Sequence, residues 1–227
     1  FFIKNLNQIT NNTLKSYKED YKKIKLLKKK QILIDNSKIY EVDKIFWLLN
    51  DCKKFGTLPF AGLARSGFVA IELLNSLVRL KIISEDDKSK FLSTINTITS
   101  KIIKDYGRFN KKKFLKIYGH LRPNTYEISI RNYEDGFNDY FNKRIRSQKI
   151  KKKHFKFSIK QKNEISDLLK KNEINLTFDK FIEFLKNSIE YREEAKFIFT
   201  KSIDLIFKNI KKISKRLKIN YEQFAYV

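Results

Sequence analysis

The stretch that sets this chain apart is AGLARSGFVAIELLNSLVRL, residues 61–80. Its main polar side chains, Arg65, Glu72 and Arg79, are spaced by seven and therefore fall on one narrow line of a helix. Nearly every other position is apolar or small, which predicts a helix that is buried on almost all sides. Small residues in its first half would also let a second backbone approach closely.

Outward from this stretch, the sequence predicts helices with few interruptions. Only six Gly and two Pro occur among 227 residues, a composition that favours long helices. Apolar residues recur at helical spacing in several other segments. We therefore expect an all-α, multi-helix domain with long antiparallel helices, which also cover residues 3–27, 42–52, 84–103, 111–118, 159–171 and 177–213.

Local signals indicate where these helices end. Ser84 followed by Asp87 matches a capping box, whereas Gly56 and Pro59 are expected to interrupt the helix that begins near residue 42. Turn-forming residues predict an irregular loop segment near residues 119–140. A solvated internal linker is expected at about 142–157. The basic run RIRSQKIKKK within it also fits a nucleic-acid-binding patch.

The charge of the chain has two explanations. The net charge is +25, from 50 basic and 25 acidic residues, which is typical of proteins that bind nucleic acid or an anionic membrane. However, 41 of the basic residues are Lys and nine are Arg, and Lys, Ile, Asn, Phe and Tyr all have A- or T-rich codons. Codon bias therefore competes with a polyanion partner. Attraction to phosphate-bearing ligands is expected in either case.

Several features bear on the setting of the protein. Cys52 is the single cysteine, so no internal disulfide is expected. No apolar run approaches the length of a membrane span and no secretory leader is recognised, so we expect a cytoplasmic location and no membrane partner. The chain begins Phe1-Phe2-Ile3 and contains no Met, and we expect it to be one domain, residues 1–227, of a larger multidomain protein.

The last long helix contains the first candidate site. Arg192 and Lys196 occupy its apolar stripe between Ile189 and Phe199. Charges in a buried stripe are costly unless they are paired or face a ligand. They therefore indicate either an internal salt bridge, for example to Glu72, or a cationic wall of an anion-binding cleft.

Two further candidates lie near helix ends. His120 and Arg122 follow the helix over residues 111–118, where a His can transfer a proton, bind a phosphate oxygen or cap the helix. Arg65 opens the apolar helix and either forms an internal salt bridge or projects into a site. The sequence contains no Gly-rich phosphate loop, zinc-ligand spacing or nucleophile elbow, so it does not predict a self-sufficient active site.

Three blocks of the sequence resemble segments of phosphoenolpyruvate-synthase-like and pyruvate-phosphate-dikinase-like phosphotransferases. They are TLPFAGLARSGF at residues 57–68, YGHLRPNTYEI at residues 118–128 and YREEAKFIFTKS at residues 191–202, and they occur in the order of that family. The family has Gly where this chain has Asn124, a residue that tolerates positive φ. Rifampicin phosphotransferases are more distantly similar and place the Arg of the second block one position earlier than Arg122.

The resemblance implies the central, acceptor-side helical domain of an ATP-dependent phosphotransferase, a kinase-type transferase. Its partners would be an ATP-grasp domain and a mobile phospho-histidine domain of the same polypeptide, together with a small-molecule acceptor, while nucleic acid is not expected. ATP and Mg²⁺ would serve the parent enzyme and would not bind to this segment. His120 would be catalytic, and the acceptor or phosphoryl group would be bound by Arg65, Arg122, Arg192, Lys196 and Lys201. The alternatives are a basic nucleic-acid-binding module and a passive helical scaffold.

Overall fold

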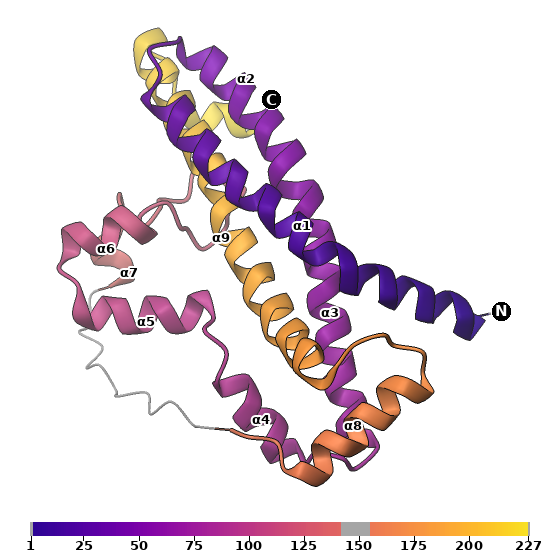
Figure 1. The fold of residues 1–227 in the computed structure, drawn as a ribbon. Coiled ribbons are helices and arrows are strands. Elements are labelled where there is room, and N and C mark those ends of the chain that lie inside the picture. Colours follow the sequence, from indigo (N-terminus) through magenta and orange to yellow (C-terminus); the bar gives the residue numbers. More distant parts are fainter. Residues whose placement is uncertain (1, 142–154, 227) are drawn as a thin grey trace. The chain divides into compact units, whose positions relative to one another are not determined.

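The computed structural model describes residues 2–141 and 155–226, and these residues form helices without any strand. The all-α prediction is therefore confirmed for the described part of the chain. Figure 1 labels the helices α1 to α9. In chain order the elements are α1 (Phe2–Asn36), α2 (Glu41–Cys52), the π-helical turn η1 (Lys53–Thr57), α3 (Leu58–Arg79), α4 (Glu85–Ser93), α5 (Ile98–Arg108), α6 (Lys111–Tyr118), α7 (Phe137–Tyr140), α8 (Ile159–Lys171), α9 (Phe178–Leu217) and the 3-10 helix η2 (Tyr221–Tyr226).

The chain divides into two compact units, each built from three separate segments. The first unit contains Phe1–Tyr21, Phe60–Ile98 and Ile150–Glu194, and the second contains the three segments that alternate with them, Lys22–Pro59, Thr99–Lys149 and Ala195–Val227. Because α1 and α9 each contribute residues to both units, the two units share long helices along the chain.

Aromatic rings and helix caps organise the first unit. Tyr21 stacks on Tyr191, with ring centroids 3.6 Å apart, and donates a hydrogen bond of 2.6 Å to Glu194. The predicted capping box at Ser84 and Asp87 is present at the start of α4. Gln161, in the capping box of α8, donates to Asp87 over 3.3 Å and so holds the starts of these two helices together.

The carboxyl end of the predicted linker belongs to the first unit. Residues 142–154 lie outside the described residues, so most of the linker and its basic run are not placed. Phe155 and Phe157 pack against Phe91, with ring centroids 6.2 and 5.8 Å from it. The last residues of the predicted linker are therefore packed against α4.

In the second unit, the end of α1, the whole of α2 and the end of α9 lie side by side (Figure 1). Leu48, Leu205 and Ile206 form a buried apolar cluster there, against which Ile34, Ile45, Phe207 and Ile210 pack. Gln31 of α1 donates to the Ile198 carbonyl over 2.8 Å and to Ser202 over 2.7 Å. These buried bonds fix the register of α1 on α9.

The predicted interruption at Gly56 and Pro59 is a π-helical turn that joins α2 to α3 without a break. The Leu58 N–H donates to the Lys53 carbonyl, five residues earlier, which widens the turn. Gly56 is buried, and a Cβ added there would lie 3.0 Å from Leu27 and 3.1 Å from Phe199. A side chain at this position would therefore collide with the core.

Two other expectations about helices are corrected. The helix predicted over residues 84–103 is divided into α4 and α5, because Glu190 and Glu193 of α9 accept hydrogen bonds of 2.9 Å from the backbone N–H groups of Asn96 and Ile98. Residues 61–80 are also not buried on nearly all sides, since the Phe68 side chain is 64% exposed.

The expectation about membrane-spanning length is wrong as well. Within the described residues, the helical run Glu41–Arg79 is long and apolar enough to cross a membrane, with a mean hydropathy of 1.3 over 18 residues. Only 33% of that window is buried. A core helix of a soluble protein meets the same criterion, so this is weak evidence for a membrane segment.

Candidate functional site

The six residues predicted to form one site fall into two groups. Arg65 and Arg192 belong to the first unit, whereas His120, Arg122, Lys196 and Lys201 belong to the second. Each group is described within its own unit.

In the first unit, an exposed aromatic ring contacts one candidate arginine and lies on the same helix face as another. Arg65 and Phe68 are one turn apart on α3 and therefore share its solvent-facing side. Arg192 of α9 crosses this surface, with its guanidinium carbon 5.1 Å from the centre of the Phe68 ring. We refer to Arg65, Phe68 and Arg192 as the arginine face.

Small residues let α3 and α9 approach closely enough to form this face. Gly67 and Ser66 on α3 and Ser188 on α9 are buried. A Cβ added at Gly67 would lie 2.9 Å from Cδ of Arg192 and 3.6 Å from the Ser188 carbonyl oxygen. The missing side chain at Gly67 therefore provides the space in which the Arg192 side chain lies.

The arginine face carries positive charge that acidic side chains do not balance. Among the described residues, no carboxylate forms an ion pair with Arg65 or Arg192. Glu72, the partner that the sequence suggested for Arg192, pairs with Arg79 on the same helix. A guanidinium group with free N–H donors, such as that of Arg192 over the Phe68 ring, can bind an anion such as a phosphoryl group in a bidentate manner.

The prediction that Arg192 and Lys196 interrupt a buried stripe is wrong. Both side chains are exposed, and the buried line of α9 lies beside them. This line repeats every seven residues through Phe181, Ser188, Ala195, Ser202 and Asn209. Its middle positions are Ser and Ala, whose weak hydrophobicity hides them from a search for apolar residues.

In the second unit, Arg122 is buried and neutralised. Its guanidinium forms an ion pair with Asp204 of α9 and donates to the carbonyls of Glu127 at 3.4 Å and Ile130 at 3.3 Å. Asn132 donates to the same Asp204 oxygen over 2.8 Å. Arg122 therefore holds the irregular segment onto α9, and its charge is already satisfied inside the protein.

His120 lies beside this ion pair and is also buried. Its Nε2 is 2.9 Å from the Phe197 carbonyl oxygen, so Nε2 carries a proton and donates it. Burial lowers the pKa of His120 to about 4, and the charges of Lys201 and Lys208 act in the same direction, against the Phe197 hydrogen bond and Asp204. The ring is therefore neutral near pH 7, and a catalytic role for it remains a prediction.

The two remaining candidates are lysines on α9. Lys196 is exposed, whereas Lys201 is half-buried and lies close enough to His120 to affect its charge. Neither forms an ion pair with a described carboxylate. They add positive charge to the second unit.

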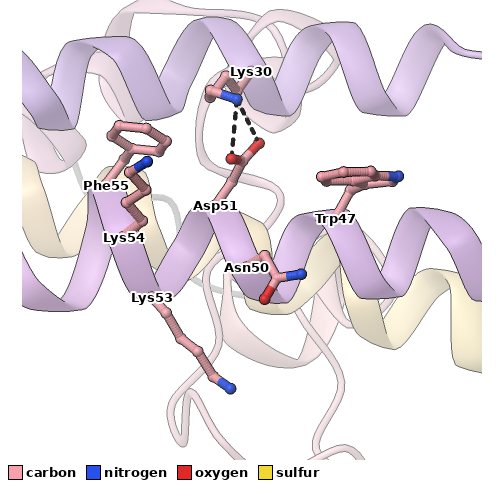
Figure 2. A pocket seen from close by; sticks show the side chains of 7 residues that line it. All are labelled: Lys30, Trp47, Asn50, Asp51, Lys53, Lys54 and Phe55. Atoms are coloured by element: carbon pink, nitrogen blue, oxygen red, sulfur yellow. Dashed lines mark hydrogen bonds and ion pairs between the residues drawn. The ribbon is translucent and has the colours of Figure 1, made fainter.

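The sequence analysis missed a hollow on the surface of the second unit. The hollow has a volume of about 630 Å³. Figure 2 shows the side chains that line it, which are Lys30, Trp47, Asn50, Asp51, Lys53, Lys54 and Phe55. The single Trp of the chain, six residues before a Lys-Lys pair, was a signal that could have found it. Within residues 2–141 and 155–226, no group of three or more His, Cys, Asp or Glu side chains is placed to hold a metal ion.

Comparison of the chain with protein-family models, with curated proteins and with solved structures finds no match.

Proposed function

We propose that this chain is the central, acceptor-side helical domain of an ATP-dependent phosphotransferase similar to phosphoenolpyruvate synthase. In this proposal the parent protein is cytoplasmic, uses ATP and Mg²⁺, and carries the phosphoryl group on a histidine outside this chain. The sequence blocks at residues 57–68, 118–128 and 191–202 support the proposal by their order and their residues.

The observation that carries the proposal is the arginine face. Phosphoryl transfer requires cations that stabilise negative charge on the equatorial oxygens of the transferred group. Arg65 and Arg192 are unpaired among the described residues, and Arg192 is held over Phe68 by a contact that leaves its N–H donors available. An arginine in a salt bridge, such as Arg79, would have to lose its partner before binding phosphate.

The second unit contributes a rigid support in this proposal. Arg122 and His120 anchor the irregular segment through Asp204 and the Phe197 carbonyl. In this proposal Arg122 positions that segment, His120 keeps its predicted catalytic role, and Lys196 and Lys201 add positive charge within the second unit. The acceptor itself is a small molecule that receives the phosphoryl group.

The test uses the full-length parent protein with isotopically labelled ATP. We expect an acid-labile, base-stable phospho-histidine to form and then to discharge to a small acceptor. Arg192→Leu should slow discharge by about tenfold or more, the effect of removing a transition-state cation. Its helix content, measured by circular dichroism, should stay unchanged.

Arg79→Leu is the matched control, because it removes an exposed arginine from the same unit that is paired with Glu72. Discharge at the wild-type rate in Arg192→Leu would overturn the assignment of the arginine face. Absence of any phospho-histidine would reject the phosphotransferase proposal. Binding of random duplex DNA with a steep salt dependence would then favour the nucleic-acid-binding module.

A further inference from the structure

The hollow of the second unit combines an aromatic wall with an excess of positive charge. Its lining comes from the end of α1, the end of α2 and the start of η1 (Figure 2). The volume of about 630 Å³ lies within the range of small-molecule sites, roughly 300–1,000 Å³. None of its residues belongs to the site that the sequence predicted.

The charges of the hollow do not cancel. Lys30 forms an ion pair with Asp51, with an N–O distance of 3.0 Å, and Asp51 is the only acidic residue among the described lining residues. The ammonium groups of Lys30 and Lys54 both lie over the Phe55 ring, 5.2 and 5.3 Å from its centre. Three ammonium groups and one carboxylate leave a surplus of two positive charges. An anion is therefore the expected type of ligand.

The aromatic wall adds a second requirement. Trp47 is 51% exposed, although Trp side chains are large and on average highly buried. Phe46 contacts it edge-on, with ring centroids 5.4 Å apart, and so limits its movement. Figure 2 shows Trp47 on one side of the Lys30–Asp51 pair and Phe55 on the other. A flat ligand ring can stack on Trp47 while its charged part reaches the lysines.

The π-helical turn η1 explains why two adjacent lysines border the hollow. The turn starts at Lys53, and its buried Gly56 packs against Leu27 and Phe199. This packing fixes the wider turn, and Lys53, Lys54 and Phe55 take their positions from it. Such turns are rare and frequently occur at functional sites.

We propose that this hollow binds a nucleoside phosphate. The base stacks on Trp47, the amide of Asn50 offers a hydrogen bond to a polar group of the ligand, and the phosphate lies beside Lys54 and Lys30, while Lys53, which points away from them, adds positive charge at the rim. A phosphate without a ring would leave Trp47 exposed to solvent. An uncharged nucleoside would leave the positive charge of the lysines without a counter-ion. The inference does not depend on the proposed phosphotransferase function.

Because the chain contains one Trp, its fluorescence reports on this hollow directly. The experiment titrates the full chain with adenosine monophosphate and triphosphate, with adenosine, and with inorganic triphosphate. We expect saturable quenching by the nucleotides that weakens as salt rises. Adenosine and inorganic triphosphate should each bind at least about tenfold more weakly than the nucleotides. Adenosine lacks the phosphate that the lysines bind, and inorganic triphosphate lacks the base that stacks on Trp47.

Variants identify the residues. Lys53→Gln with Lys54→Gln should weaken nucleotide binding by about tenfold, whereas Lys28→Gln with Lys29→Gln on α1 removes the same charge from exposed positions outside the hollow and should leave binding unchanged. Trp47→Ala, which has no tryptophan fluorescence, is measured by equilibrium dialysis of labelled nucleotide, and its affinity should also fall about tenfold. Circular dichroism confirms that each variant is folded.

Three results would overturn the proposal. Inorganic triphosphate that binds as tightly as the nucleotides would show that the base is not recognised. Equal weakening by the two lysine pairs would show only general attraction to a basic protein. A single-stranded oligonucleotide that binds through Trp47 at least a hundredfold more tightly than the monophosphate would replace the nucleotide site with an extended nucleic-acid surface.

Discussion

Arg192 lies across the ring of Phe68, with its guanidinium carbon 5.1 Å from the ring centre and its Cδ in the space left by Gly67. The contact holds a long, flexible side chain at the surface without using a carboxylate. Cation–π contacts at exposed positions contribute about 0.5–1 kcal/mol, which orients a side chain but does not stabilise a fold strongly. This combination suits a binding residue better than a structural one.

Phe68→Leu tests this relationship. The variant keeps an apolar side chain but removes the ring, so the free energy of unfolding should fall by less than about 1 kcal/mol. In the full-length parent, however, phosphoryl discharge should slow by about threefold or more, because Arg192 loses its fixed orientation. Tyr40→Leu, which removes another exposed ring, should change stability similarly and leave discharge unaffected.

Asp204→Asn tests the buried ion pair of the second unit. Loss of the carboxylate leaves Arg122 buried without a counter-ion, which costs about 3–5 kcal/mol of unfolding free energy. Urea denaturation at pH 7 measures the loss. Asp135→Asn removes an exposed carboxylate that pairs with Lys211 at 3.4 Å, and it should cost about 1 kcal/mol or less. Equal losses in the two variants would contradict the structural role of Asp204.

His120 predicts how stability depends on pH. Its pKa is lowered from 6.5 to about 4 by burial, so between these two pH values the unfolded chain binds a proton that the folded chain does not. The contribution of neutral His120 to the free energy of unfolding is complete above pH 6.5. It is lost as the pH falls toward 4, by about 3 kcal/mol in total.

The measurement compares urea denaturation of the wild type and of His120→Gln between pH 7 and pH 4.5. The variant cannot take up this proton, so its stability should fall less steeply with decreasing pH. Taking the difference between the two proteins removes the contribution of carboxylates, which titrate in both. Parallel pH profiles would show that His120 is not held neutral by the fold.

Local signals in the sequence were enough to predict much of the helical fold. The capping box at Ser84 and Asp87 depends on residues three positions apart, and the helix at α6 on residues close together in the chain; both are present where the pattern placed them. The break between α4 and α5 was missed because Glu190 and Glu193, far along the chain, provide its hydrogen bonds. The spacing of apolar residues cannot predict hydrogen bonds between residues so far apart in the sequence.

The candidate site was predictable only in part, for a related reason. Arg122 was predicted to bind the acceptor or phosphoryl group, but its partner Asp204 is 82 residues away and no local pattern connects them. Arg192 and Arg65 were found by position, yet the ring of Phe68 between α3 and α9 became visible only in three dimensions. Trp47 was overlooked because a single aromatic residue in an amphipathic helix reads as part of the core.

The hydrogen bonds that the backbone N–H groups of Asn96 and Ile98 donate to Glu190 and Glu193 have a consequence for how the chain folds. They join positions 94 and 95 residues apart, so a large loop must close before the bend between α4 and α5 can be fixed. Loop closure costs conformational entropy, and contacts of this kind slow folding. We therefore expect this bend to be among the last parts of the first unit to become ordered, with the amides of Asn96 and Ile98 gaining protection late in pulsed hydrogen exchange. Early protection of these amides, before that of α9, would mean that the bend forms from local preferences instead.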